Sequence, residues 1–146
     1  MAERERRTIA ATIISESLRH GYDPLFVQAI VEVESTCRPA VRSHAGAIGL
    51  IQIKPATARS VAQRYGIRWR GASMLLDPGV NVQLGLQYLA ELEERFQDPY
   101  LAVAAYNLGP TRVARMAPTR ARRSRYVREV FRRYEGLLSE YGTLGL

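Results

Sequence analysis

The carboxylate of Glu34 is the side chain in this sequence whose surroundings best suit acid–base chemistry. Three aliphatic residues precede it at helical spacing, namely Val27, Ile30 and Val31. Glu34 therefore continues the apolar stripe of a helix that begins at Pro24. Apolar neighbours and the partial negative charge of a helix C-terminus both raise the pKa of a carboxyl group, as general-acid catalysis requires. A solvated glutamate at a frayed helix end is the simpler interpretation, and position alone favours it.

Gln52 is a second polar residue with a candidate chemical role. It lies among apolar residues in segment 43–55, whose glycines allow close approach of the backbone to a ligand or another helix. A buried amide must find hydrogen-bond partners. Gln52 therefore either binds a substrate or ties down its own loop, and both roles stay open.

Two further segments combine tyrosine with polar neighbours. Tyr106 and Asn107 end a helix ahead of Gly109, a residue suited to a left-handed C-cap. Tyr126 lies in an arginine-rich stretch, where its ring would be buried and its hydroxyl wet. An ordinary helix terminus and an amphipathic anchor are the simpler interpretations of these two segments.

The elements that must position these residues are helices. Apolar spacing and the Asp-Pro pairs at 23–24, 77–78 and 98–99 predict a mostly α, single globular domain over 1–146, with about seven helices. The expected helices cover 3–19, 24–35, 55–65, 77–96, 98–109, a short turn around Val113, and 122–141. Segment 47–53 alone suits an extended conformation. The first helix is expected to bury Ile9, Ile13, Ile14 and Leu18.

Composition excludes several classes of protein. An apolar fraction of 47% excludes disorder of the whole chain. One cysteine excludes a disulfide scaffold and a cysteine-based zinc site, and two histidines make a histidine-based site unexpected. No segment has the roughly 18 apolar residues of a transmembrane helix. The run from Ile9 to Ile14 is a poor signal peptide, so any export signal is expected in a larger parent protein or to have been removed.

Four motifs in order resemble the catalytic domain of the soluble lytic transglycosylases, a lysozyme-like family that cleaves bacterial peptidoglycan. Glu34-Ser35 resembles the family's catalytic Glu-Ser, and 43–53 resembles its Ser-x-x-Gly-Ala-x-Gly-Leu-Met-Gln loop. Segment 105–109 is similar to its Ala-Tyr-Asn-Ala-Gly motif, and Tyr126-Val127 to its last motif. The resemblance covers about residues 20–130. Ile51 replaces the usual Met, an exchange that should still pack, and Leu108 replaces a small Ala, an exchange that would narrow or reshape the groove.

The resemblance implies a reaction and a set of site residues. Glu34 would be the single catalytic acid and then base, acting on the bond between N-acetylmuramic acid and N-acetylglucosamine. The sugar's own 6-hydroxyl would attack, giving a 1,6-anhydro product, so no second carboxylate is needed. The residues that would orient the sugar are Ser43, Gln52, Tyr106, Asn107 and Tyr126. No metal and no cofactor is implied.

The resemblance also implies partners and a location. Peptidoglycan glycan strands are the expected substrate, in the bacterial cell envelope, either periplasmic or secreted, with a larger parent protein or an envelope-spanning assembly as context. A goose-type-like lysozyme, which hydrolyses the same bond, and a non-catalytic wall-binding module are the alternatives. Nucleic acid is not expected, because such binding would leave the four motifs unexplained. The sequence does not indicate an oligomeric state.

The positive charge of the chain is concentrated after residue 109. The whole chain carries a net charge of +7, and residues 110–146 contribute nine arginines and three glutamates, which is +6 of that total. Such a segment suits an anionic partner. One hypothesis is that Arg122, Arg123 and Arg125 hold wall polymer through the carboxylates of its stem peptides. The alternative is a solvated helix face.

Overall fold

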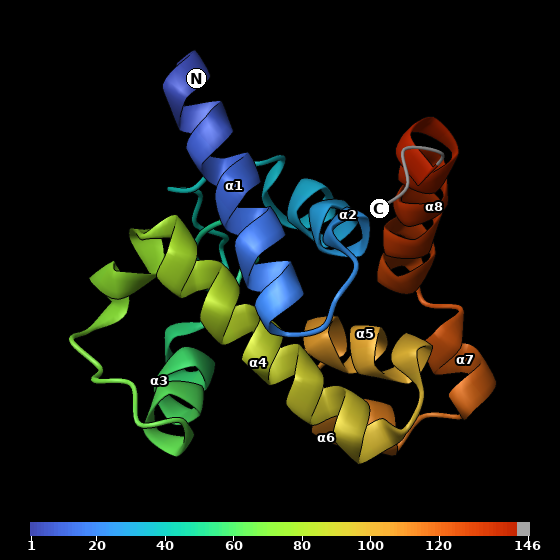
Figure 1. Ribbon diagram of the computed structural model, residues 1–146. Helices are drawn as coiled ribbons and strands as arrows, with labels where there is room; N and C mark the ends of the chain where they lie inside the picture. Colours follow the sequence, from blue (N-terminus) through green and yellow to red (C-terminus); the bar gives the residue numbers. More distant parts are fainter. Residues whose placement is uncertain (143–146) are drawn as a thin grey trace. The chain divides into compact units, whose positions relative to one another are not determined.

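The computed structural model describes residues 1–142, which contain eight α-helices and one short 3-10 helix (Figure 1). The elements are α1 (Glu3–Arg19), α2 (Pro24–Ser35), α3 (Pro55–Arg64), η1 (Ala72–Leu76), α4 (Pro78–Phe96), α5 (Pro99–Leu108), α6 (Pro110–Ala114), α7 (Pro118–Arg122) and α8 (Arg125–Tyr141). The expected mostly α fold is confirmed, with one helix more than the seven predicted. Within residues 1–142, no helix is both long and apolar enough to cross a membrane.

Prolines and aspartates set the helix starts. Six of the seven prolines occupy the first position of a helix, where the missing N–H costs nothing and the fixed φ already suits the helix. The three predicted Asp-Pro starts are confirmed. Asp23, Asp77 and Asp98 each accept hydrogen bonds from backbone N–H groups of the following turn, at 2.8–3.0 Å. The chain therefore marks its helix boundaries locally.

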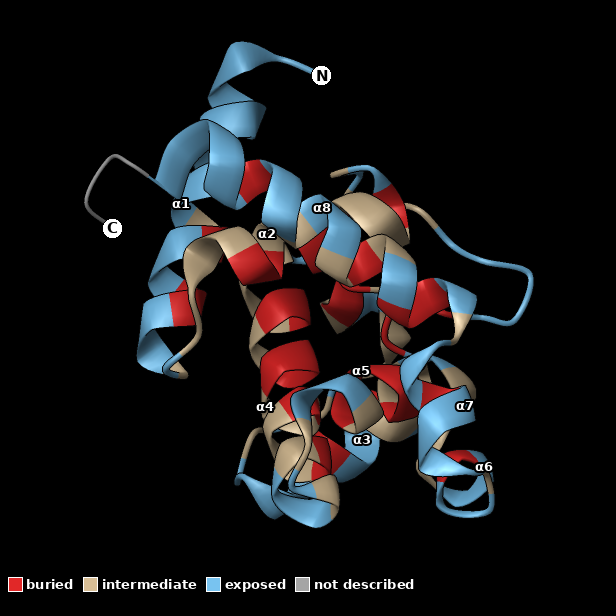
Figure 2. Ribbon diagram, turned by 90° about the vertical axis from the view of Figure 1, so that its right-hand side faces the viewer, coloured by how far each residue is buried: buried red, intermediate tan, exposed pale blue. Residues whose placement is uncertain are grey.

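The chain divides into two compact units, residues 1–87 and the remainder from Tyr88. The first contains α1, α2, α3, η1 and the first half of α4. Within it, α1 packs against α2, and the segment 47–53 is almost entirely buried. Buried residues recur along α4 from Asn81 to Leu92 (Figure 2).

The buried face of α1 differs from the predicted one. Ile9 and Ile13 are buried as expected, but Ile14 is 50% exposed and Leu18 is 66% exposed. Glu16 and Ser17 are buried in their place. Ile9, Ile13 and Ser17 are spaced by four residues and form one buried row along the helix. Ile14 and Leu18 lie on the neighbouring row, which faces solvent.

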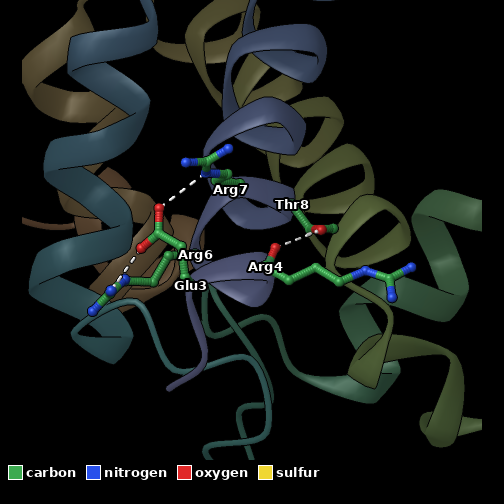
Figure 3. A network of polar contacts seen from close by, with 5 residues as sticks. All are labelled: Glu3, Arg4, Arg6, Arg7 and Thr8. Atoms are coloured by element: carbon green, nitrogen blue, oxygen red, sulfur yellow. Dashed lines mark hydrogen bonds and ion pairs between the residues drawn. The ribbon is translucent and has the colours of Figure 1, made fainter.

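The first turn of α1 is held by exposed charges (Figure 3). Glu3 accepts hydrogen bonds from Arg6 at 2.7 Å and from Arg7 at 2.9 Å, and these bonds lower the pKa of its carboxyl group. The residue before the helix, Ala2, offers no side-chain cap. An acidic residue in the first turn is favourable with the helix dipole, although exposed ion pairs contribute little to stability. These N-terminal arginines are therefore engaged within their own helix.

The second unit is organised around α5, which packs against α6, α7 and α8. Ala102 to Ala105 are all buried. Burial raises the pKa of the Asp98 carboxyl at the start of α5, but hydrogen bonds from Leu101 N–H, the Arg122 guanidinium and Tyr100 N–H outweigh this effect and hold the pKa below its ordinary value of 3.8.

The end of the chain departs from the predicted helices at two points. Pro118 opens a separate short helix, α7, and the last helix begins at Arg125 rather than at 122. Ser124 caps α8 by accepting a hydrogen bond from Val127 N–H. Gly109 has the expected positive φ of 91°, but its ψ of 141° lies outside the left-handed helical region. Gly109 joins α5 to α6 in a conformation that strongly favours glycine.

Candidate functional site

Glu34 is the last residue but one of α2, and its side chain is half-buried. Two features end the helix directly after it. The buried hydroxyl of Ser35 donates to the carbonyl of Val31 at 3.0 Å, and Thr36 adopts a left-handed conformation with a φ of 50°. Cys37 also has a positive φ. The backbone turns away at once, so Glu34 stands at the end of the helix and not in its middle.

The neighbouring glutamate of α2 is engaged differently. The carboxylate of Glu32 accepts a hydrogen bond from the amide of Gln28 at 2.7 Å, one turn back on the same helix. The same amide group lies 3.5 Å from the sulfur of Cys37. Glu32 is therefore tied to its own helix surface, which makes it a natural comparison for Glu34.

The loop between α2 and α3 folds back on itself and is not extended as predicted for 47–53. Ile48 forms isolated β-bridges with both Arg42 and Ile53, and no strand forms in the described chain, residues 1–142. Ser43 lies at the exposed tip. Its hydroxyl oxygen accepts from Ala47 N–H at 3.0 Å, and its own N–H donates to the Ala47 carbonyl at 2.9 Å. Ser43 thus closes the tip of the loop.

Gln52 ties down the same loop. Its backbone has a left-handed φ of 51°, and its side-chain amide nitrogen donates to the carbonyls of Val41 at 3.1 Å and Gly49 at 3.0 Å. Of the two roles left open by the sequence, loop fixing is present. Among residues 1–142, no donor bonds to the amide oxygen of Gln52, so this half-buried acceptor is available to a ligand.

Asn81 is a positioning residue that sequence reasoning missed. It is fully buried in α4. Its side-chain oxygen accepts from Ile51 N–H at 2.9 Å, and its nitrogen donates to the carbonyls of Ile48 at 2.8 Å and Leu75 at 3.0 Å. Asn81 therefore holds the segment that carries Gln52. The available signal was a lone asparagine at the start of an apolar helix face.

Gly49 belongs to the same contact. Its φ is +82°, and a Cβ atom placed there would lie 2.7 Å from both the Leu75 carbonyl oxygen and the side-chain carbon of Asn81. Any larger residue would displace the asparagine or the backbone. The glycine is therefore needed for a close approach as well as for its φ angle.

Tyr106 and Asn107 end α5 in the second unit. The half-buried Tyr106 packs its ring against that of Tyr88, with centroids 5.5 Å apart and planes at 47°. Asn107 is exposed at the end of the helix. The buried alanines that precede this pair fix the helix, so the pair stands on a rigid support. Tyr126 lies in the first turn of α8 and is 9% exposed.

The six candidate residues fall into two sets. Glu34, Ser43 and Gln52 belong to the first unit, where Ser43 and Gln52 stabilise a single loop. Tyr106, Asn107 and Tyr126 belong to the second unit, on α5 and α8. Within residues 1–142, no group of three or more histidine, cysteine, aspartate or glutamate side chains is arranged to hold a metal ion.

Two of the three arginines selected from the charge pattern are already paired. Arg122 lies 2.7 Å from the carboxylate of Asp98, and Arg125 lies 2.8 Å from that of Glu129. Both pairs are partly exposed and contribute little to stability. Their charges are nonetheless partly neutralised, which weakens the hypothesis that these arginines hold wall polymer.

Known proteins are similar to this chain in sequence and in fold. The soluble lytic murein transglycosylase of Salmonella typhimurium is 40% identical over 90 residues, covering 60% of this chain and 14% of that protein. The endo-type membrane-bound lytic murein transglycosylase A of Klebsiella pneumoniae is 41% identical over 101 residues, covering 61% of this chain and 49% of that protein. The chain thus spans at most about half the length of these two relatives.

A solved structure supports the fold. It is that of an inactive variant of lytic transglycosylase Slt from Pseudomonas aeruginosa, in which glutamine replaces a glutamate. The alignment covers 97% of this chain and 25% of that one, with a TM-score of 0.78 and 29% identity, which confirms the expected lysozyme-like α fold. The sequence profile described as Transglycosylase SLT domain matches residues 11–128, which is most of the chain. The chain belongs to the transglycosylase SLT domain family.

Proposed function

We propose that this chain is a peptidoglycan lytic transglycosylase, with Glu34 as its single acid–base group. The observation that carries the proposal is a half-buried glutamate where α2 stops abruptly, in a chain of the SLT family. The related Pseudomonas aeruginosa variant described as inactive carries a glutamate-to-glutamine change. The two relatives named above are both lytic murein transglycosylases.

In the proposed reaction, Glu34 gives its proton to the glycosidic oxygen between N-acetylmuramic acid and N-acetylglucosamine. The bond to that oxygen breaks through an oxocarbenium-like transition state. The 6-hydroxyl of the muramic acid then attacks its own anomeric carbon, and the Glu34 carboxylate takes the hydroxyl proton. The product ends are a 1,6-anhydro-muramic acid and a free 4-hydroxyl, and Glu34 is again protonated.

A mechanism with one carboxylate fits the roles of three other acidic residues. Asp77 and Asp98 were expected to cap helices, and both accept backbone hydrogen bonds at helix starts. Glu32 is bonded to Gln28. These three carboxylates have structural roles, which supports Glu34 as the residue that both gives and accepts the proton.

The other candidate residues would bind and orient the sugar. The amide oxygen of Gln52 can accept from an N-acetyl N–H, and the exposed amide of Asn107 can bond to a hydroxyl or carbonyl group of the sugar. The half-buried Tyr106 offers part of an apolar ring face as well as a hydroxyl, whereas Tyr126, which is 9% exposed, would act through its hydroxyl. Ser43 contributes by setting the shape of its loop. Replacing Gln52 or Asn107 should therefore weaken substrate binding more than replacing Ser43.

We also infer that both units serve one transglycosylase domain spanning 1–146, since the matched region, 11–128, includes parts of each. Glycan strands of peptidoglycan are the proposed substrate. The proposed location is the cell envelope, in the periplasm or after secretion. A larger parent protein fits the fact that the chain spans 14% and 49% of the two relatives compared.

The proposal is tested by comparing Glu34→Gln with Glu32→Gln on purified sacculi. Both changes exchange one carboxylate of α2 for an isosteric amide. General acid–base catalysis contributes about 100- to 10,000-fold in rate, so Glu34→Gln should lower the release of soluble fragments by at least 100-fold. Glu32→Gln should keep most of the activity. Both variants should still bind sacculi.

Mass spectrometry of the released fragments tests the type of reaction. The wild-type protein should give 1,6-anhydro ends. Reducing ends alone would show a hydrolase of the goose-type-lysozyme kind. A wild-type protein that binds sacculi but releases nothing would show a wall-binding module, and equal activity in the two variants would refute the assignment of Glu34.

A further inference from the structure

A second cationic segment lies in the first unit. No aspartate or glutamate occurs in the sequence between Glu34 and Asp77, and residues 35–76 contain one lysine and six arginines. The net charge of residues 1–109 is only +1, because acidic residues outside this segment balance it. The segment therefore forms a local concentration of positive charge that the total for the N-terminal part conceals.

Within this segment, a small hollow lies between α3 and the open connection that follows it (Figure 1). It has a volume of about 220 Å³ and is lined by Arg59, Gln63, Ile67 and Trp69. The N–H of Ile67 donates to the carbonyl of Ala62 at 2.8 Å, which fixes the connection against the end of the helix. Small-ligand sites usually measure about 300–1,000 Å³, so the size of this hollow favours a partner that covers the surface over an enclosed small molecule.

The arginines around the hollow are not neutralised by the protein. Arg59, Arg68 and Arg70 are exposed, and within residues 1–142 their guanidinium groups take part in no ion pair and no side-chain hydrogen bond. Arg122 and Arg125 of the second unit, by contrast, are bonded to carboxylates. Three unpaired guanidinium groups close together in the sequence and around one hollow suit an anionic partner, and the guanidinium fork matches the geometry of a phosphate group.

Aromatic and apolar side chains accompany these arginines. Ile67 and Trp69 are half-buried, and Tyr65 is 48% exposed. Tryptophan and tyrosine favour the interface between water and the acyl chains of a membrane, where an arginine can also lay its hydrocarbon stem on apolar surface and keep its charge among the headgroups. A nucleic acid could pair with the arginines and stack on Trp69, but it would leave Ile67 without an apolar partner. The combination therefore favours a lipid surface.

We propose that an anionic phospholipid membrane binds to the surface formed by Arg59, Ile67, Arg68, Trp69 and Arg70, called the α3 patch below. The guanidinium groups contact the lipid phosphates, and the tryptophan ring lies at the level of the headgroups. The inference goes beyond the proposed function, because it concerns attachment of the protein to a membrane surface and not the cleavage of a bond. The acid–base group of the reaction has no part in it.

Trp69 is the only tryptophan in the sequence, so its fluorescence reports directly on the α3 patch. The full chain is mixed with vesicles of phosphatidylcholine alone and with vesicles of equal parts phosphatidylcholine and phosphatidylglycerol. Binding to the anionic vesicles should shift the Trp69 emission to shorter wavelength, and lipids brominated on their acyl chains should quench it. Vesicles of phosphatidylcholine alone should produce neither effect at the same lipid concentration.

Two triple variants, each lacking three exposed arginines, show whether the patch or the overall charge is responsible. The patch variant carries Arg59→Gln, Arg68→Gln and Arg70→Gln. The control removes the same charge from α7 and α8 through Arg120→Gln, Arg128→Gln and Arg132→Gln, whose side chains also lack a partner within the described residues. A basic residue held at an anionic membrane strengthens binding about fivefold, so the patch variant should bind the anionic vesicles about 100-fold more weakly than the wild-type protein. The control, whose charges lie away from the bound surface and are screened by salt, should lose less than about tenfold.

Four results would overturn the inference, once thermal unfolding has shown that both variants are folded. They are no binding of the wild-type protein to anionic vesicles, equal losses of binding in the two triple variants, vesicle binding without quenching of Trp69, or tighter binding to single-stranded oligothymidylate than to the anionic vesicles in the same buffer. The last result would identify a nucleic-acid site. Failure of the proposed function is distinguishable, because digestion of sacculi is measured without lipid and Glu34→Gln should bind vesicles as the wild-type protein does.

Discussion

Replacing Asn81 by alanine should loosen the loop that carries Gln52. The substitution removes the partners of one buried N–H group, that of Ile51, and of two carbonyl groups, those of Ile48 and Leu75. Asn81 is fully buried in α4, so a solvent molecule does not readily replace its side chain. The effect on stability should therefore be unusually large for the loss of a single amide.

The magnitude follows from the three bonds. A buried polar group left without a partner costs about 1–3 kcal/mol, with the smaller values expected for carbonyls, which have a second lone pair. For Asn81→Ala we expect the free energy of unfolding to fall by about 3–5 kcal/mol. In a chain of this size, such a loss lowers the melting temperature by about 10 °C. Since most domains are stable by about 5–15 kcal/mol, this loss is a large fraction of the total stability.

Urea unfolding and hydrogen exchange at the Ile51 amide together measure the effect. Gln83→Ala is the control, because Gln83 is a half-buried amide on the same helix with no side-chain hydrogen bond in the described chain. Gln83→Ala should change stability by less than about 1 kcal/mol. The Ile51 amide should exchange faster in Asn81→Ala than in the control. Equal stability losses in the two variants, or a fully protected Ile51 amide, would refute the reasoning.

Two further substitutions test the local structure. Gly49→Ala should lower the free energy of unfolding, measured with urea, by about 3 kcal/mol, because its Cβ would lie 2.7 Å from the Leu75 carbonyl oxygen. Gly46→Ala is the control, since Gly46 has a similar φ of +86° but no atom near its Cβ position, and it should cost about 1 kcal/mol. Equal losses in the two variants would contradict this. Asp98→Asn keeps a good N-cap but loses the charge facing Arg122. The pKa of Asp98 is lowered in the folded state, so its charge stabilises the protein above about pH 4 and stops doing so as the pH falls through the folded pKa. Wild type should therefore exceed Asp98→Asn by about 0.5–1 kcal/mol at pH 6, and a gap that persists at pH 2 would contradict this origin.

The features predicted best from the sequence are those with local causes. Asp23, Asp77 and Asp98 mark helix starts through hydrogen bonds to backbone atoms two or three residues away. Proline acts within its own residue. These signals do not depend on what the helix packs against, so helix starts were recognised without knowledge of tertiary structure.

The errors concern features that depend on packing partners. Ile14 and Leu18 were expected to be buried because they are apolar, but Glu16 and Ser17 are buried instead in the helix that packs against α2. Apolar spacing finds a helix more reliably than it finds the buried face, because two rows can satisfy the same pattern. The extended conformation suggested for 47–53 was wrong for a similar reason, since residues 49–52 form a turn between the bridge residues Ile48 and Ile53.

Motif resemblance and physical reasoning found different parts of the candidate site. Glu34 and Gln52 stand in short motifs and were selected from the sequence, with the resemblance deciding against the simpler interpretations. Asn81 has no motif, and its bonds join residues 30 and 33 positions away along the chain. A single sequence carries no record of such a pairing. Only the fold brings the asparagine side chain to the loop.

The support beneath Gln52 is as informative as the residue itself. A glutamine that merely filled space would not need a buried asparagine, a glycine with a close contact and a left-handed backbone of its own to fix its position. Strained backbone conformations cost free energy and persist where the surrounding structure holds them in place. Here the surrounding contacts fix the direction of the Gln52 side-chain amide, and its oxygen has no hydrogen-bond partner within residues 1–142. Such a fixed and unpaired acceptor is what recognition of an N-acetyl N–H would require, and it supports a substrate-binding role for Gln52 independently of the motif.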